Sequence, residues 1–273
     1  MTHVIQIPDT GFVAVTGKDA LKFLQGYTTC DLNDLTPSLA GLGATCNLQG
    51  RMLANYRIVR IEDGYLLRMH ARLTEPFISF LSKYIVFSKA KLEDCSDRYK
   101  AWGVIDDQEQ PPAPAGSCEA LDDGWRIRIS DKPNFEIWSE KDLTVTGTDL
   151  QWQALEVAEG ILWVNNETTE TYIPQMFNLH GLGGIAFDKG CYLGQEIVAR
   201  MQYRGELSRK LYRGSGADLQ TGDELSTPEG KAIGQVLAIA GGQFLAVLQS
   251  KTELSEVTTP GGKSVAVSLA QTA

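Results

Sequence analysis

Short runs of hydrophobic residues predict β-strands in the first half of the chain. Residues 12–15, 52–61 and 65–69 are each rich in apolar and aromatic side chains. The Asp63-Gly64 pair between the last two runs is typical of a tight hairpin turn. Residues 125–129 alternate apolar with charged side chains, which indicates a strand with one buried face. The pattern therefore predicts antiparallel sheet structure in this part of the chain.

Other segments space their hydrophobic residues by about one helical turn. This spacing predicts helices over residues 18–25, 72–84 and 152–160. Gly26 and Gly160 end the first and the third of these helices, because a glycine readily adopts the backbone conformation that follows a helix. A further helix is predicted directly after the turn at residue 194.

The pattern changes after Gly205, where short apolar runs alternate with glycine-containing turns. Runs at residues 232–239, 244–248 and 264–269 predict short strands of a small antiparallel barrel or sandwich. We therefore expect an α+β body over residues 1–205 and a β-module over residues 206–273. A proline-rich stretch at 110–116 suggests a subdomain seam near residues 105–120, whereas residues 90–150 are otherwise not diagnostic.

Composition places the chain among ordinary globular proteins. Of its 273 residues, 43% are hydrophobic and 22% are charged. No run of apolar residues is long enough to predict a membrane span, and the first residues do not resemble a secretory signal. The five cysteines are scattered, which argues against a disulfide framework and favours a cytoplasmic location. The three histidines show no spacing typical of a metal site, so no metal is expected.

Charge is distributed unevenly. The net charge of −9 disfavours a broad nucleic-acid-binding face, and therefore direct binding of tRNA. Residues 188–213, however, hold six basic and three acidic side chains, a local surplus of three positive charges. This segment is either a solvated surface or a small site for a phosphate or a carboxylate.

The candidate chemistry lies in the same segment. Cys191 follows Lys189 and Gly190 and precedes the predicted helix. The positive end of a helix and a nearby cation both favour a thiolate, which is the reactive form of cysteine. Cys191 is therefore either a reactive thiol or a small side chain that packs into the core.

The run Lys189-Gly190-Cys191-Tyr192-Leu193-Gly194-Gln195-Glu196 resembles the signature of the YgfZ family, which is paralogous to the T-protein (aminomethyltransferase) of the glycine cleavage system. Further agreement covers the opening third of the chain and residues 155–213. It is found at residues 17–20, 23–26, 173–175, 178–179, 183–187, 197–200 and 203–205, and at Cys46, Gly50 and Arg51.

The resemblance implies a T-protein-like folate-binding body of two intertwined α/β subdomains, followed by a small antiparallel β-barrel. It implies an accessory protein that binds tetrahydrofolate or a one-carbon derivative and supports iron–sulfur enzymes, and thereby tRNA modification. Iron–sulfur enzymes or their assembly factors would be transient clients. The implied reactive residues are Cys191 and Lys189, and the implied ligand-binding residues are Gly190, Tyr192, Gly194, Gln195, Glu196, Arg200 and Arg204.

The chain departs from the T-protein at two places. Ala54 and Asn55 align with the acidic pair that holds the catalytic aspartate, and neither can carry a negative charge. Glu159 stands one residue away from the position of the pterin-binding glutamate, which on a helix turns it by about 100°. Aminomethyl transfer in glycine cleavage is therefore not expected. A one-carbon transferase that acts on another acceptor remains the alternative.

Overall fold

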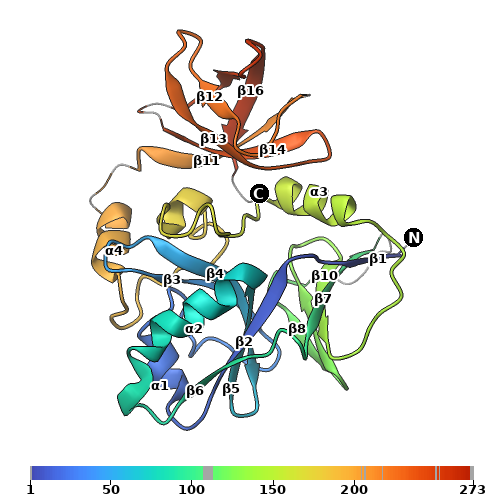
Figure 1. Cartoon of the computed structure of the whole chain (residues 1–273), viewed down its shortest axis with the longest axis vertical. Helices are drawn as coiled ribbons and strands as arrows, with labels where there is room; N and C mark the ends of the chain where they lie inside the picture. The colour runs from blue at the N-terminus through green and yellow to red at the C-terminus, as the bar shows by residue number, and fades with distance from the viewer. Residues whose placement is uncertain are drawn as a thin grey trace.

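The computed structural model describes residues 2–106, 113–203, 205, 207–216, 218–249, 251 and 253–270. Figure 1 shows two sheets side by side in the lower part of the molecule and a barrel above them. None of the helices in the described ranges is both long and apolar enough to cross a membrane.

The first sheet carries the two helices that border the candidate site. Its strand order is β3-β4-β5-β2-β6, formed by β2 (Thr10–Thr16), β3 (Gly41–Cys46), β4 (Met52–Ile61), β5 (Gly64–His70) and β6 (Lys91–Asp94). Helices α1 (Ala20–Gln25) and α2 (Thr74–Ser82) pack against it, and each buries its apolar side chains, such as Leu24 and Phe77. The short helices η1 (Ala71–Leu73) and η2 (Ile85–Phe87) flank α2.

The second sheet takes strands from both sides of the first one in the sequence. Its order is β1-β7-β10-β9-β8, formed by β1 (Thr2–Gln6), β7 (Lys100–Asp106), β8 (Cys118–Leu121), β9 (Gly124–Arg128) and β10 (Asn134–Ser139). The chain thus starts in this sheet, builds the first sheet, and returns. This path makes the two subdomains intertwined.

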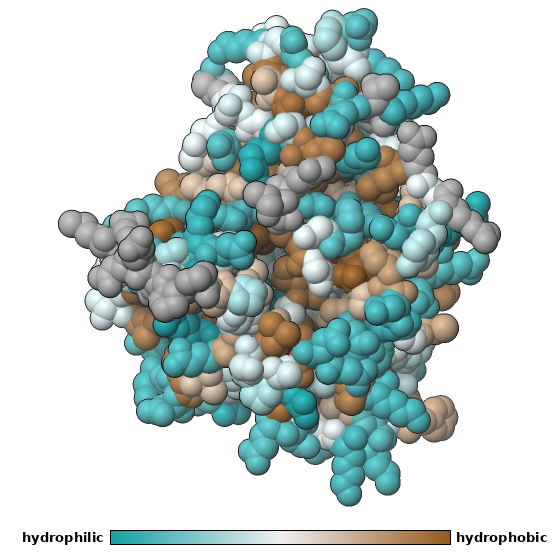
Figure 2. Space-filling view, turned by 180° about the vertical axis from the view of Figure 1, so that it is seen from behind, coloured by the Kyte–Doolittle hydropathy of each residue, from teal (hydrophilic) through white to brown (hydrophobic). Residues whose placement is uncertain are grey.

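The C-terminal strands form a closed antiparallel barrel. Its order is β11-β14-β13-β12-β15-β16, formed by β11 (Arg209–Ser215), β12 (Glu224–Ser226), β13 (Ala232–Ala240), β14 (Gln243–Gln249), β15 (Glu256–Thr258) and β16 (Ser264–Leu269). Pairing of β11 with β16 closes it, which leaves no free sheet edge. The view from behind shows hydrophobic side chains gathered in the middle of the molecule below the barrel (Figure 2).

Helix α3 (Asp149–Glu159) connects the second sheet to the barrel, because it contacts β1, β13 and β14. Gly103 on β7 leaves room for the buried indole of Trp152, whose ring atoms occupy the space that a Cβ would need. Gly160 ends α3 in the left-handed conformation, as its position predicts. The connection to the barrel then contains η3 (Pro174–Phe177) and α4 (Gln195–Tyr203).

A buried ion pair joins the two sheets. Arg57 on β4 and Arg68 on β5 lie directly opposite each other, and both face the carboxylate of Glu136 on β10. The Arg57 Nε atom lies 3.3 Å from Glu136 Oε1, and Trp138 Nε1 donates to Glu136 Oε2 at 2.9 Å. Adjacent like charges in a sheet repel, so the shared carboxylate is what makes this pairing of arginines tolerable.

The α+β class and the helices and strands expected from hydrophobic spacing are confirmed. The pattern missed the strands β1, β3, β6, β7, β8, β10, β11, β12 and β15. Strand β1 pairs with β7, about 100 residues away along the chain, so no local turn signals the pairing. The expected seam near 105–120 joins β7 and β8 of the same sheet, and residues 107–112 lie outside the described ranges. Gly116 nevertheless contacts the first subdomain, where its carbonyl accepts from Ala40 N.

Candidate functional site

The segment that carries Cys191 is fastened to the turn that follows α1. Thr29 Oγ1 donates to the carbonyl of Gly184 at 2.6 Å, and the backbone N–H of Ala186 donates to the carbonyl of Thr29 at 2.9 Å. The N–H of Leu193 donates to the carbonyl of Gly26 at 3.0 Å. Two segments that are about 160 residues apart therefore form one rigid unit.

Lys189 makes three of the hydrogen bonds that hold these two segments together. Its ammonium donates to the carbonyls of Gln25, Thr28 and Cys30 at 2.9, 2.8 and 2.7 Å, and the residue is only 7% exposed. The Nζ atom also lies 5.2 Å from the centre of the Tyr192 ring. Burial lowers the pKa of the Lys189 ammonium to about 8, so it is still mostly protonated at neutral pH. All three donors are bound within the chain, so Lys189 positions the loop.

Close backbone contacts explain the glycine before α4. Gly194 has φ +82°, and an added Cβ would clash with the backbone oxygen of Asn47 in the turn between β3 and β4. Gly50 in that turn likewise packs on Ile197 of α4. By contrast, nothing lies within 4 Å of the position that a Cβ of Gly190 would take. Packing therefore explains Gly194 and leaves open space beside Gly190.

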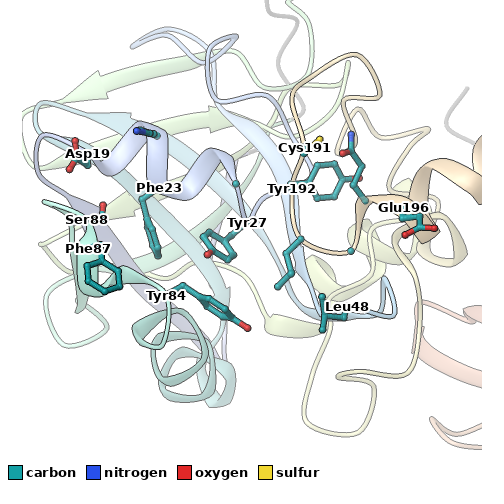
Figure 3. Close-up of a pocket in the computed structure, with 15 residues that line it drawn as sticks. Asp19, Phe23, Tyr27, Leu48, Tyr84, Phe87, Ser88, Cys191, Tyr192 and Glu196 are labelled. Carbon is teal, nitrogen blue, oxygen red and sulfur yellow. The ribbon is translucent and has the colours of Figure 1, made fainter.

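Cys191 lies on the wall of a cavity of about 740 Å³, which we call the thiol cavity. It is lined by Asp19, Lys22, Phe23, Gly26, Tyr27, Leu48, Tyr84, Phe87, Ser88 and residues 191–196. Figure 3 shows the aromatic side chains between α1 and the segment of Tyr84, with Cys191 and Tyr192 on the segment that precedes α4. The ring centres of Phe23 and Tyr27 are 5.0 Å apart, and those of Tyr27 and Tyr84 are 5.2 Å apart. A cavity of this size with an aromatic wall can hold a flat heterocyclic ligand.

The five cysteines differ in their access to solvent. Cys191 is exposed, whereas Cys30, Cys46 and Cys95 are buried and Cys118 is partly buried. Burial raises the pKa of all four of the latter thiols, that of Cys118 to about 11. Cys191 is therefore the cysteine whose position permits chemistry with an external molecule.

We expect Cys191 to react with iodoacetamide at neutral pH at least about tenfold faster than the other four cysteines, because burial raises their pKa values and blocks access. Brief labelling followed by peptide mapping by mass spectrometry measures the five rates. Equal labelling of Cys191 and Cys118 would show that the exposed thiol has no special reactivity.

The structure brings most of the expected site residues together. Cys191, Tyr192, Gly194, Gln195 and Glu196 line the thiol cavity, and Gly190 directly precedes Cys191. Arg200 is exposed on α4 and is not among the described residues that line the thiol cavity. Arg204 lies outside the described residues.

The sequence did not point to most of the residues that line the thiol cavity. Phe23 and Tyr27 come from α1 and the turn after it, and Tyr84 comes from the segment after α2. Lys22 on α1 is a basic residue that lines the thiol cavity. Phe23 and Tyr84 fall within segments predicted as helices, where an apolar side chain is ordinary, so the sequence carries no separate signal that they line a cavity.

At both places where the chain departs from the T-protein pattern, a side chain contacts another part of the chain. Asn55 is 2% exposed; its amide donates to the carbonyl of Leu162 at 2.8 Å and accepts from Val164 N at 2.7 Å. A carboxylate could not donate to Leu162, so asparagine fits this position and aspartate does not. The displaced Glu159 pairs with Lys132 at 3.1 Å. In the described residues, no group of three or more His, Cys, Asp or Glu side chains is arranged to hold a metal.

Sequence comparison finds relatives over most of the chain. It is 31% identical over 281 residues to the tRNA-modifying protein YgfZ of Photobacterium profundum, covering 93% of this chain and 85% of that protein. It is 31% identical over 263 residues to that of Klebsiella pneumoniae (86% and 80% covered) and 30% identical over 229 residues to that of Colwellia psychrerythraea (77% and 71% covered). No protein-family model matches the chain.

Structure comparison identifies the fold. The glycine cleavage system aminomethyltransferase T from Bartonella henselae superposes with a TM-score of 0.78 over 98% of this chain and 84% of that one, at 18% sequence identity. At this identity the match shows a common fold and leaves the activity open. The expected T-protein-like body with a C-terminal barrel is thereby confirmed.

Proposed function

Since this chain belongs to the YgfZ family, we propose that it is a folate-binding accessory protein that supports iron–sulfur enzymes and through them tRNA modification. The observation that carries the proposal is the position of Cys191. The exposed thiol lies on the wall of the thiol cavity, beside an aromatic surface from a distant part of the chain. The family signature thus faces a space in which a bound ligand and a thiol can meet.

The residues of the thiol cavity fit a reduced folate. Phe23, Tyr27 and Tyr84 offer ring faces for a flat pterin. Asp19 and Glu196 offer carboxylates to its N–H groups, and Lys22 offers a cation to its carboxylate tail. A bound tetrahydrofolate would supply a carrier for one-carbon units. The chain's own residues would hold that ligand beside Cys191.

Lys189 and Gly190 set the position of the thiol. The three carbonyl contacts of Lys189 fix the loop one residue before the open space at Gly190. That open space lets a client or ligand approach Cys191 without a side chain in the way. Lys189 therefore acts as a positioning residue for the reactive thiol.

The rim of the cavity suits a protein client. Val86 and Phe87 in η2 are 71% and 100% exposed, and Leu48 at the opposite rim is 71% exposed. Apolar side chains that project into water at a cavity mouth are typical of a surface that another protein covers. The client in this proposal is an iron–sulfur enzyme or assembly factor. The net charge of −9 fits a protein partner better than direct contact with tRNA.

The alternative, a one-carbon transferase on another acceptor, has less support. Ala54 and Asn55 stand where the T-protein has its acidic pair, and the side chain of Asn55 makes two backbone hydrogen bonds. The two functions are separated by mass spectrometry of the folate after incubation with the protein. An unchanged one-carbon state supports the accessory role, and a changed state supports the transferase.

We expect tetrahydrofolate to bind with a dissociation constant near micromolar, or about −8 kcal/mol, in anaerobic calorimetric titration. Tyr84→Ala should weaken binding about tenfold, because it removes one stacking surface. Lys22→Glu should weaken it by a similar factor, because it replaces an attractive charge with a repulsive one.

Lys18→Glu is the matched control for the charge reversal, since Lys18 is exposed near the start of α1 but does not line the thiol cavity. Its affinity should equal that of the wild type. Absence of binding at millimolar tetrahydrofolate would refute the folate assignment. Normal binding by both Tyr84→Ala and Lys22→Glu would place the ligand elsewhere.

A further inference from the structure

A cavity of about 390 Å³ lies where the first subdomain meets the barrel, and we call it the junction cavity. Helices η3 and α4 supply one side of it, and the barrel strands β11 and β16 supply the other. It is lined by Gln175, Asn178, His180, Met201, Gln202, Gly205, Leu207, Lys210, Leu211, Leu269 and Ala270. Among the described residues, none lines both this cavity and the thiol cavity, so the two are separate sites.

One buried polar atom on the wall of the junction cavity has no hydrogen-bond partner in the described part of the chain. Gln175 is 4% exposed, and its Nε2 atom donates to the carbonyl of Val198 in α4 at 2.7 Å. The Val198 carbonyl needs a donor, so this contact identifies the other end of the amide as the oxygen. That oxygen, Gln175 Oε1, is unpaired. Buried acceptors are normally satisfied, so this one marks a place where an N–H group of a ligand would be stabilised.

Hydrogen bonds between η3 and the barrel hold this wall in place. Asn178 ends η3 in the left-handed conformation, and its Nδ2 atom donates to the carbonyl of Ala270 at 2.9 Å. The backbone N–H of Ala270 in turn donates to the carbonyl of Leu211 on β11 at 3.0 Å. Gln175 is therefore presented from a fixed backbone, which lowers the entropic cost of binding a ligand.

The residues around the unpaired oxygen favour a neutral and largely apolar ligand. The apolar part of the wall consists of Met201, Leu207, Leu211 and Leu269. The described lining residues include no aspartate or glutamate, and Lys210 is basic, so a cation would find no carboxylate to offset its charge. Burial lowers the pKa of His180 below its ordinary value of 6.5, so its ring is neutral at neutral pH. A methionine thioether also packs well against aromatic rings.

We propose that the junction cavity binds a small neutral heterocycle, which donates a ring N–H to Gln175 Oε1 and packs its rings against Met201 and the neighbouring leucines. The cavity volume is near the lower end of the range for ligand pockets, about 300–1,000 Å³, which suits one ring or two fused rings. The other end of the Gln175 amide holds α4, so an occupied cavity links the barrel to the helix that follows Cys191. The site is separate from the proposed folate site, and either can fail without the other.

The test uses the whole protein with benzimidazole and N-methylbenzimidazole, two probes that differ only in whether the ring nitrogen carries a hydrogen or a methyl group. For a dissociation constant near 1 mM, about 5 mM benzimidazole should raise Tm by roughly 2–4 °C. The methylated probe should bind about fivefold more weakly, because it cannot donate to Gln175 Oε1. No shift with benzimidazole, or equal shifts with the two probes, overturns the proposal.

Gln175→Met tests the hydrogen bond to the ligand. It removes the Oε1 acceptor, so the two probes should bind this variant with equal affinity, and the fivefold preference for benzimidazole should disappear. A preference that persists in Gln175→Met would mean that the N–H of the probe has another partner, which overturns the assignment.

Met201→Trp tests the location without removing a hydrogen bond. The larger ring narrows the junction cavity from the side of α4 and should weaken benzimidazole binding at least about tenfold. Tyr203→Trp is the matched control, because it places the same ring on α4 at a residue that is 69% exposed and does not line the cavity. Its affinity should equal that of the wild type. A Tm shift that survives Met201→Trp unchanged would place the probe elsewhere and overturn the proposal.

Discussion

Glu136→Gln is expected to lower the free energy of unfolding by about 3–5 kcal/mol, because it removes the one carboxylate that two buried arginines share. Arg57 and Arg68 face each other across β4 and β5, so without Glu136 their charges would repel in a region that water does not reach. Chemical denaturation followed by circular dichroism measures the loss. Because Glu136 joins the first sheet to the second, the damage should extend to both subdomains.

Glu140→Gln is the matched control. Glu140 pairs with Arg98 at 2.6 Å, but both side chains are substantially exposed. Solvent screens such a pair, so this substitution should change the free energy of unfolding by no more than about 1 kcal/mol. If both variants lost a similar amount of free energy of unfolding, the buried ion pair would contribute no more to stability than the exposed one.

Glu136→Gln should also change how the free energy of unfolding depends on pH in the acid range. Burial alone would raise the pKa of Glu136, but Arg57 and Arg68, with a hydrogen bond from Trp138, hold it below its ordinary value of 4.5. The unfolded chain therefore takes up this proton first as the pH falls. The stabilisation is complete above about pH 4.5 and is lost as the pH falls further through the lowered folded-state pKa. The difference in stability between wild type and Glu136→Gln should accordingly shrink below pH 4.5.

Lys189→Met should lower the free energy of unfolding by about 3–5 kcal/mol and also displace Cys191. The substitution keeps the length of the side chain but leaves the carbonyls of Gln25, Thr28 and Cys30 without their shared donor. The loop before α4 would then lose its strongest link to the turn after α1. Thermal denaturation measures the stability, and hydrogen exchange of residues 186–194 measures the loosening of the loop.

Lys83→Met provides the comparison, because Lys83 is exposed on the segment after α2 and its Nζ atom lies 6.0 Å from the centre of the Phe80 ring. It should change the free energy of unfolding by no more than about 0.5 kcal/mol. If Lys189→Met were as stable as Lys83→Met, and its loop exchanged no faster, the three carbonyl contacts would not fasten the loop.

Much of the local structure follows from the sequence. The spacing of Leu73, Phe77 and Leu81 predicts α2, and Asp63-Gly64 predicts the turn between β4 and β5, because helices and hairpins form between neighbours in the chain. The glycine-punctuated strands after Gly205 likewise predict the barrel. The signature around Cys191 also identifies the family, and with it the fold.

The sequence could not give the partners of the signature residues. Lys189 was expected to assist the thiol directly, but its ammonium is bound by carbonyls from a segment about 160 residues away. Arg200 was expected to anchor a ligand; Lys22 on α1, and not Arg200, is among the described residues that line the thiol cavity. The partners of a charged side chain are the groups that folding brings next to it. Contacts between distant segments produce no periodic pattern in the sequence, so the sequence does not reveal these partners.

The sequence by itself determined that a thiol, a flexible glycine and a helix follow one another at residues 190–203, since these are properties of adjacent residues. The tertiary structure alone decided that aromatic rings from the region of α1 and from the segment after α2 line the same cavity as Cys191. It also decided that Arg57 and Arg68, on paired strands, share one carboxylate from the other sheet. Both arrangements depend on which strands and helices pack together, and packing is set by burial over the whole chain.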